Sequence, residues 1–452
     1  MEARQSPLIV GIEDKLPLGQ TLIFAFQHLL ALTGIWIFPV IIGHAAGMNN
    51  TEIGGLVAAC FITTGVVTIL QSSRVVRLPV VQGPTAAFFV AVLSSVHTVG
   101  LGTAFGSMTV AALIFAALAI PYKKLGLLGL LVRYISPPIV FGTLLVIIGA
   151  QLAQIGPMGW FGDSGNPADI SASAITTLVT FLVVLICMTL GRQTLVKRGA
   201  LLWGVIVGTA VYAVLGDYHL PALGETRWLA APRLYPFGFG VSAPVVLMML
   251  LAFLQAGAEA MGMYTLLCQW GNKPLPVHVV NRGLFTEFLG CALGAAAGGL
   301  GTTSYPENVG IIRVTRVGSR YVTLTAGILS LALGLIPKVG LLIASLPAPV
   351  LAAACTLLFG IIAMSGIGML SRIEWDDLNI VVAAPAFIIS LGTMYLPKKA
   401  VALFPEILQG IVTQPMVVGI VMLIVMNVLV NVWIRPMISK NAPALVPANH
   451  DF

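Results

Sequence analysis

Three glutamates lie within long apolar stretches of the sequence, where an ionised side chain is costly. Of the sixteen acidic residues, only Glu259, Glu287 and Glu307 are placed in this way. A charge at the centre of a membrane helix costs about 2.5–3.5 kcal/mol, so such a carboxyl needs a partner, a water-filled cavity or a function. A carboxyl that faces water on alternate sides of a membrane can also carry a proton across it. We predict that Glu259 and Glu307 bind a ligand or a proton rather than only fixing helix packing. For Glu287 both interpretations stay open, and it could be a supporting partner or a proton relay.

Three further side chains could take part in binding. His28 follows Gln27 in the first apolar stretch, where the two form the only strongly polar pair. His28 could hold a proton beside the site, or it could simply make a hydrogen bond between helices. Tyr264 and Phe359 could stack on a flat ligand, although aromatic side chains in membrane spans usually serve packing.

Residues 298–316 form a polar, glycine-rich stretch where a membrane helix should be uniformly apolar. Pro306 cannot donate a backbone hydrogen bond, and it favours an extended conformation in the residue before it. From Glu307 the chain can turn helical. An extended piece that becomes a helix within the bilayer leaves free N–H groups, which are tolerated only where they line a cavity or meet a ligand. We therefore predict a binding centre around Pro306, Glu307 and Asn308; a glycine-rich loop before an ordinary span is the alternative.

The composition is that of a polytopic membrane protein. The 452 residues are 58% hydrophobic and 9% charged, with a mean hydropathy of +1.00, whereas soluble domains carry about 25% charged residues. The net charge of +7 does not indicate nucleic-acid binding, because Lys and Arg lie between the apolar segments. The five cysteines are odd in number and lack metal-ligand spacing, so we expect no metal. Hydrolase, zinc-protease and phosphate-loop motifs are absent, so we expect neither a cofactor nor an enzyme.

The apolar segments predict fourteen transmembrane spans. They cover residues 19–43, 52–71, 79–96, 102–121, 137–156, 172–191, 199–216, 241–266, 283–300, 302–318, 321–337, 346–366, 378–396 and 408–434. With an even number of spans both termini lie on one side, and most of the 23 Lys and Arg residues then fall on that side. The positive-inside rule makes it the cytoplasmic side.

Two short spans occupy matching places in the chain. The third and the tenth contain Gly83-Pro84 and Tyr305-Pro306, so each is expected to begin extended and to continue as a half helix. They are the third spans of two seven-span halves, residues 1–216 and 241–437, and an odd number of spans inverts the second half. Paired interrupted spans of this kind indicate an inverted-repeat transporter with its site near the middle of the membrane.

Several motifs resemble those of the nucleobase–ascorbate transporters, also called the uracil/xanthine permease family. The matching residues are Glu307-Asn308-Val309-Gly310 with Thr315-Arg316, then Leu346 to Leu351 with Phe359-Gly360 and Gly366, and finally Gln27-His28 and Gly83-Pro84-Thr85. The chain departs from the second pattern at Ala352 and Ala353, where the family has two glycines. The resemblance extends from about residue 15 to 437.

The resemblance implies an all-α membrane protein of fourteen spans in two inverted seven-span repeats, with short strands in the broken spans 3 and 10. Spans 1–4 and 8–11 would form a core domain, and spans 5–7 and 12–14 a gate domain. The core would move past the gate in an elevator motion, within a homodimer in the plasma membrane.

The resemblance also implies site residues and a substrate class. Glu259 would accept N–H groups of a nucleobase, Glu307 would be the second acid of the site, and backbone N–H groups near Ala86 and Glu307 would face base carbonyls. Ala86 and Ala87 replace a bulkier aromatic, and Pro306 stands where uracil-type members have glycine. The residues after Glu259 resemble purine-type members, whereas Glu307-Asn308 resembles uracil-type members, so both substrate classes stay open.

The function expected is proton-coupled import of a nucleobase, with Glu287, Glu307 and His28 as candidates for proton coupling. An anion exchanger or channel-like protein on the same fold is the alternative. It predicts cations rather than acids at the site.

Overall fold

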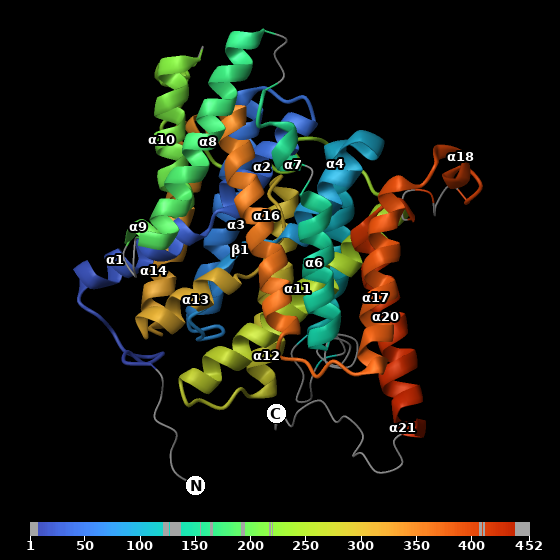
Figure 1. Cartoon of the computed structure of the whole chain (residues 1–452). Helices are drawn as coiled ribbons and strands as arrows, with labels where there is room; N and C mark the ends of the chain where they lie inside the picture. The colour runs from blue at the N-terminus through green and yellow to red at the C-terminus, as the bar shows by residue number, and fades with distance from the viewer. Residues whose placement is uncertain are drawn as a thin grey trace.

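The protein is mostly helical, and its helices run largely along one direction (Figure 1). The structure is a computed structural model that describes residues 8–120, 126, 137–153, 155–162, 166–190, 195–216, 218, 220–405, 409 and 412–438. Within these ranges eight helices are long and apolar enough to cross a membrane, and a bent pair of helices brings the number to nine. The multi-pass character is thus confirmed, while the number of fourteen spans stays a prediction.

In the described residues of the first half of the chain there are ten elements. They are α1 Leu18–Ala31, α2 Gly34–Ala45, α3 Asn50–Ser72, β1 Gln82–Pro84, α4 Ala86–Leu118, α6 Pro138–Leu152, α7 Ile155–Met158, α8 Pro167–Leu190, α9 Leu195–Arg198 and α10 Ala200–Leu215.

The second half begins with a short turn of 3-10 helix. Its elements are η1 Leu223–Glu225, α11 Ala243–Trp270, α12 Val277–Ala296, β2 Thr302–Ser304, α13 Pro306–Thr315, α14 Arg320–Gly334, α15 Pro337–Ala344, α16 Ala348–Leu370, α17 Asp377–Gly392, η2 Thr393–Tyr395, α18 Lys398–Val401, α20 Pro415–Asn427, the π-helical η3 Val428–Ile434 and α21 Arg435–Ile438.

Several predicted spans are broken or merged. The predicted span 19–43 is divided between α1 and α2, with the break at Leu32 and Thr33. The predicted spans 79–96 and 102–121 share α4, which is interrupted at Gly100 with φ 75° and ψ 167°. A positive φ of this size is readily adopted only by glycine. The predicted span 321–337 corresponds to α14, which is followed by α15 at a bend of 80°.

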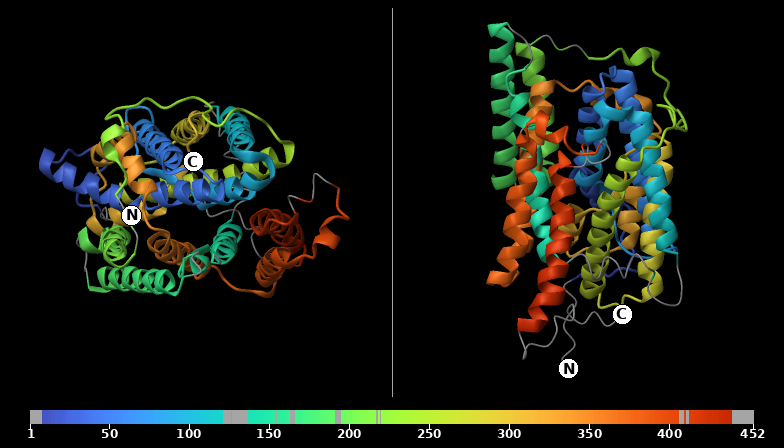
Figure 2. Two further views of the ribbon diagram at one scale, coloured as in Figure 1. Left: turned by 90° about the horizontal axis from the view of Figure 1, so that it is seen from above. Right: turned by 90° about the vertical axis from the view of Figure 1, so that its right-hand side faces the viewer.

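The helices form two groups that lie side by side, as the view from above shows (Figure 2). In the first group α1–α4 pack mainly against α11, α12, α14 and α15. In the second group α6, α8, α10, α16, α17 and α20 pack mainly against one another. Contacts between the groups are sparse, and they include those of α4 with α6 and α16, of α2 with α16 and of α11 with α20.

Within the first group, α3 approaches α14 and α15 closely through glycines. A Cβ on Gly65 would lie 2.6 Å from the backbone nitrogen of Leu331 in α14. A Cβ on Gly54 would lie 2.9 Å from the backbone nitrogen of Leu341 in α15. Small residues allow such backbone-to-backbone packing between membrane helices.

The two short strands expected in the interrupted spans are present. β1 and β2 pair antiparallel, with Gln82 opposite Ser304, Gly83 opposite Thr303 and Pro84 opposite Thr302. All six residues are buried. The ladder joins the two halves of the chain within the first helix group.

Candidate functional site

The strand pair fixes the start of two helices. α4 begins two residues after β1 and α13 begins two residues after β2. Because the strands are antiparallel, the helices leave the ladder in opposite directions and both N-termini point back toward it. The first N–H groups of a helix have no partner within the helix and carry a partial positive charge. Acceptor groups of a ligand near the ladder would therefore be favoured.

The N-terminus of α4 is lined by small residues. Thr85 precedes the helix and its hydroxyl accepts a hydrogen bond from the backbone N–H of Ala87 at 3.4 Å. The side chain of Ala86 is 7% exposed and that of Ala87 is fully buried. Neither residue fills the space beside the helix start as an aromatic side chain would.

The N-terminus of α13 is positioned by Tyr305. Its backbone N–H donates to the carbonyl of Val81 at 3.0 Å, which extends the strand pairing by one bond. Its ring lies against Gly83, where an added Cβ would be 2.5 Å from the ring, and its hydroxyl lies against Gly34, where a Cβ would be 2.8 Å away. Tyr305 thus connects the strand pair to the break between α1 and α2. Pro306, at the first position of α13, is exposed.

Glu259 and Glu307 lie close to these helix ends. Glu259 is on α11, and its Oε1 accepts a hydrogen bond from Gln255 Nε2 at 3.0 Å. The Thr303 hydroxyl donates to the carbonyl of Ala256 at 3.0 Å, which fastens β2 to α11 one turn before Glu259. Glu307 is in the first turn of α13. The two carboxyls are close enough to interact electrostatically, and both residues are partly exposed.

Glu287 lies behind the strand pair and is fully buried. Its Oε2 accepts three hydrogen bonds: from Gln82 Nε2 at 2.9 Å, the Tyr264 hydroxyl at 3.2 Å and the Ser304 hydroxyl at 3.3 Å. Gln71 Nε2 donates to the Tyr264 hydroxyl at 2.9 Å and extends the network to α3. One carboxylate thus joins β1, β2 and α11. Such a buried network keeps its members in place because each would be costly to leave unpaired.

His28 and Asn308 form a second buried contact. Asn308 Nδ2 lies 3.1 Å from His28 Nδ1 and donates to the His28 carbonyl at 3.2 Å. The side chains are 2% and 1% exposed. This contact ties α1 to the residue that follows Glu307 on α13.

The two predicted aromatic contacts are placed differently. The ring of Tyr264 is fully buried and its hydroxyl belongs to the Glu287 network. It offers no exposed face for stacking, and these contacts favour a supporting role. Phe359 comes from α16 in the second helix group; its ring is stacked 6.2 Å from that of Phe89 on α4. It therefore sits where the two helix groups meet near the start of α4.

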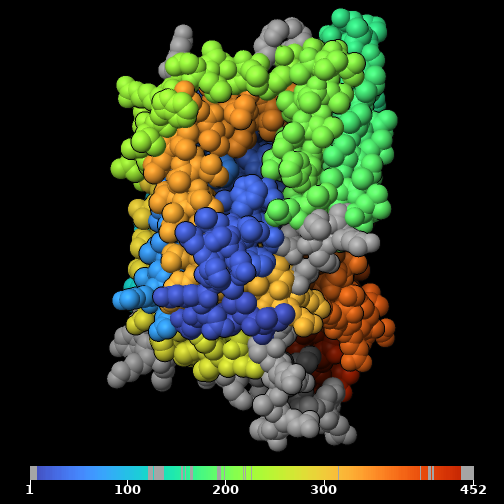
Figure 3. Space-filling model, turned by 90° about the vertical axis from the view of Figure 1, so that its left-hand side faces the viewer, coloured from blue at the N-terminus to red at the C-terminus, as the bar shows by residue number. Residues whose placement is uncertain are grey.

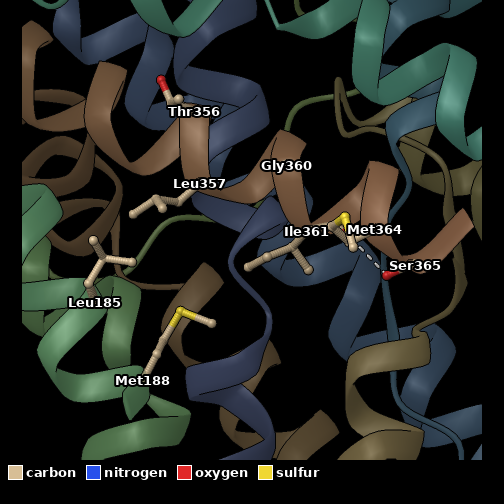
Figure 4. Close-up of a pocket in the computed structure, with 8 residues that line it drawn as sticks. All are labelled: Leu185, Met188, Thr356, Leu357, Gly360, Ile361, Met364 and Ser365. Atoms are coloured by element: carbon tan, nitrogen blue, oxygen red, sulfur yellow. Dashed lines mark hydrogen bonds between the residues drawn. The ribbon is translucent and has the colours of Figure 1, made fainter. Parts of the chain in front are cut away.

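A separate pocket of about 470 Å³ lies between α8 and α16. Figure 4 shows Leu185 and Met188 of α8 pointing toward Leu357 and Ile361 of α16. Its lining is largely apolar and includes none of the predicted site residues. The described part of the chain contains no group of three or more His, Cys, Asp and Glu side chains that could hold a metal ion.

Three buried amides that were not predicted from the sequence support the candidate site. Gln71, Gln82 and Gln255 are nearly or fully buried and donate to Tyr264, Glu287 and Glu259. Each lies within or beside an apolar stretch, where a polar side chain is costly without a partner, so the sequence does carry a signal for them.

Long apolar helices, a strand pair that precedes two helix N-termini and polar side chains gathered beside it are typical of a multi-pass membrane transport protein. The chain belongs to the permease family of the xanthine and uracil permeases, whose sequence profile matches residues 19–399. Members of this family are permeases rather than enzymes.

Three relatives cover most of the chain. It is 27% identical over 425 residues to a putative purine permease of Clostridium perfringens, with 93% of this chain and 92% of the relative covered. It is 30% identical over 388 residues to a uric acid permease of Bacillus subtilis, with 84% and 88% covered. It is 29% identical over 399 residues to the uracil permease of Bacillus caldolyticus, with 85% and 88% covered.

Two solved structures share the fold at low sequence identity. The transmembrane domain of the cyanobacterial bicarbonate transporter BicA matches with a TM-score of 0.55 at 16% identity, covering 92% of this chain and 99% of that one. The murine anion transporter Slc26a9 in its inward-facing state matches with a TM-score of 0.60 at 12% identity, covering 92% and 69%.

Proposed function

We propose that this permease imports a nucleobase, a purine or a pyrimidine, together with protons. The observation that carries the proposal is the position of Glu259 and Glu307 beside two helix N-termini that point toward one strand pair. A site of this kind offers hydrogen-bond acceptors and donors side by side. The three relatives are named as permeases for purine, uric acid and uracil, and these names support the same substrate class.

A nucleobase matches both kinds of group. It is flat, and its edge carries ring N–H donors beside carbonyl acceptors. The Glu259 carboxylate would accept the N–H groups, while backbone N–H groups near Ala86 and Glu307 would donate to the carbonyl oxygens. Such a site strongly rejects analogues that lack these groups, because its own polar groups would be left unpaired. Asn308, Pro306 and the small Ala87 would shape the rest of the pocket.

Proton coupling would use Glu307, Glu287 and His28. Glu307 Oε2 is buried and has no hydrogen-bond partner among the described residues, so it is available to a ligand or a proton. Glu287 bonds the strand pair directly, and Asn308 links His28 to the start of α13. A change in the protonation of Glu287 would therefore alter contacts of the strand pair, and a change in the protonation of His28 would alter a contact of α13.

The transport motion would follow the division into two helix groups. We assign the first group to a core domain of spans 1–4 and 8–11 and the second to a gate domain of spans 5–7 and 12–14. Fourteen spans in two inverted repeats, residues 1–216 and 241–437, would then carry the site across the plasma membrane in an elevator motion within a homodimer. Sparse contacts between the groups support this assignment. Both termini would face the cytoplasm.

Anion exchange is the second candidate, because the solved structures of similar fold include anion and bicarbonate transporters. Two carboxyls at the site oppose it, since ionised acids repel an anion. The fold likeness alone does not choose between the two.

Uptake of radiolabelled bases tests the proposal. Cells that lack their own nucleobase permeases would express the protein and receive uracil, xanthine, uric acid and hypoxanthine, with and without a protonophore and with sodium replaced by choline. We expect accumulation of at least one base that the protonophore abolishes and sodium removal leaves intact. The proposal would be refuted if proteoliposomes containing the protein transported chloride or bicarbonate but none of the bases.

A further inference from the structure

The chain before α1 lies along the end of α13. Backbone atoms of residues 9–12 form hydrogen bonds with those of residues 316–320, and Val10 forms a parallel bridge with Val317. The N–H groups of Ile9 and Val10 both donate to the Arg316 carbonyl, at 2.8 and 3.1 Å. In the other direction, the Gly318 N–H donates to the Val10 carbonyl at 2.9 Å and the Arg320 N–H donates to the Ile12 carbonyl at 3.0 Å. The Ser319 hydroxyl donates to the Asp14 carbonyl at 2.6 Å. We call residues 8–14 the N-terminal segment. In Figure 3 it runs across the face of the molecule as a dark blue band above the yellow atoms of the α11–α12 connection.

The N-terminal segment also reaches the end of α11. An added Cβ on Gly271, which follows α11 directly, would lie 2.6 Å from Ile12 Cδ1. An added Cβ on Gly318, just after α13, would lie 2.5 Å from Leu8 Cδ1. Ile12 is 2% exposed and Leu8 is 9% exposed. One short segment therefore contacts the ends of both helices that carry the predicted site acids.

The Glu13 carboxylate adds ion pairs to these backbone contacts and connects the N-terminal segment to three other parts of the protein. Glu13 Oε2 accepts from Arg320 Nε at 2.8 Å, while Oε1 lies 3.1 Å from Arg77 Nη2 and 3.3 Å from Lys273 Nζ. Arg77 precedes β1, Lys273 follows α11, and Arg320 begins α14. Arg320 is itself 6% exposed and donates from Nη1 to the carbonyl of Ser72 at 3.1 Å.

Glu13 stays ionised throughout the physiological range. Burial alone would raise its pKa, but the hydrogen bonds from Arg77, Arg320 and Lys273 outweigh burial and lower the pKa from 4.5 to about 2. The carboxylate is therefore charged at neutral pH and can attract all three cations.

We propose that the N-terminal segment sets the relative position of α11 and α13, and that Glu13 is the positioning residue that keeps the segment in place. α13 has ten residues and is about 15 Å long, so a shift at its end is transmitted to Glu307 at its start. The strand pair holds one end of α13 and the N-terminal segment holds the other. This proposal rests on the proposed function, because it assigns Glu259 and Glu307 to the substrate site.

The test compares three variants. Glu13→Gln removes the charge that holds Arg77, Lys273 and Arg320. Arg77→Gln removes a single partner and is the milder variant if Glu13→Gln fails to fold. Asp376→Asn is the matched control: its side chain is 37% exposed, against 31% for Glu13, and it binds Arg435 in the second helix group.

Hydrogen–deuterium exchange measures how well the backbone amides around α13 are protected, and it does not require a transport assay. We expect faster exchange in peptides covering residues 306–320 in Glu13→Gln, a smaller increase in Arg77→Gln and none in Asp376→Asn. Exchange at wild-type rate in Glu13→Gln would overturn the proposal even if the protein transports nucleobases.

Uptake kinetics separate positioning from mere stability. We expect KM to rise about three- to thirtyfold in Glu13→Gln, less than the roughly hundredfold that a misplacement of 1 Å can cost. The maximal rate per folded transporter should stay within roughly twofold of wild type. Faster exchange with an unchanged KM would show a structural contact only and would also overturn the proposal. A wild-type protein that takes up no base would refute the proposed function, while the exchange data would still decide the role of the segment.

Discussion

Replacing Glu259 by glutamine tests whether the Glu259 carboxylate binds the base, and it changes the shape of the side chain very little. Gln255 Nε2 lies 3.0 Å from Glu259 Oε1, and a glutamine at position 259 still offers an oxygen to that donor. The packing of α11 should therefore survive the substitution. Only the charge is lost, together with the ability to accept on both oxygens.

The magnitude follows from the hydrogen bonds that the carboxylate would make. A hydrogen bond to a charged group contributes about 1.5–3 kcal/mol net. If the glutamine keeps its oxygen on Gln255, its amide N–H₂ faces an N–H of the base, donor against donor. We expect a loss of binding of at least one such bond, which corresponds to roughly a ten- to hundredfold rise in KM or Kd.

The assay is uptake of the preferred base over a range of concentrations, corrected for the amount of folded transporter. Glu52→Gln serves as the control, because Glu52 caps the start of α3 through the Asn49 N–H at 3.0 Å and lies on the surface. Glu52→Gln should transport like wild type. A Glu259→Gln protein with KM within about threefold of wild type would refute the assignment of Glu259 to the base, since the hydrogen-bond argument requires more.

Three other perturbations address the supporting structure. Tyr264→Phe removes the hydroxyl that lies between Gln71 and Glu287 and should lower the free energy of unfolding by about 1–2 kcal/mol. The measurement is the unfolding temperature in detergent, and an unchanged temperature would argue against a stabilising hydrogen-bond network around Glu287. Gly83→Ala would press a Cβ to 2.5 Å from the Tyr305 ring and should cost about 1–3 kcal/mol and most of the uptake, and normal uptake would show that the ring can move. Because the pKa of Glu13 is lowered from 4.5 to about 2, its carboxylate stabilises the protein fully above pH 4.5 and progressively less toward pH 2. The contribution is at most about 3 kcal/mol, less with solvent screening, so the stability gap between wild type and Glu13→Gln should narrow between pH 6 and 3.5, and a constant gap would contradict the ion cluster.

The two strand-to-helix transitions could be predicted from sequence because proline acts on the backbone locally. Proline cannot donate a backbone hydrogen bond and is well tolerated at the end of a strand or in the first turn of a helix, and the structure places Pro84 at the end of β1 and Pro306 at the first position of α13. Glu259, Glu287 and Glu307 could be singled out because an acid within an apolar stretch is costly wherever it lies.

The remaining contacts depend on how distant helices are rotated against each other, and no local pattern fixes that. Gln71 and Tyr264 are 193 residues apart in the chain but share a hydrogen bond. The break between α1 and α2 at Leu32 and Thr33 carries no proline, and Gly34, which begins α2, is a weaker local sign than a proline would be. The role of the N-terminal segment depends on Glu13 meeting three cations from separate connections.

The glycine contacts of α3 with α14 and α15 leave almost no side-chain atoms between the backbones. Such a contact contains no side chains that could change rotamer, so these three helices can pack in only one arrangement. We expect them to move as one rigid unit. Distance labels attached to α3, α14 and α15 would provide a fixed reference, and the displacement of every other helix could be measured relative to it.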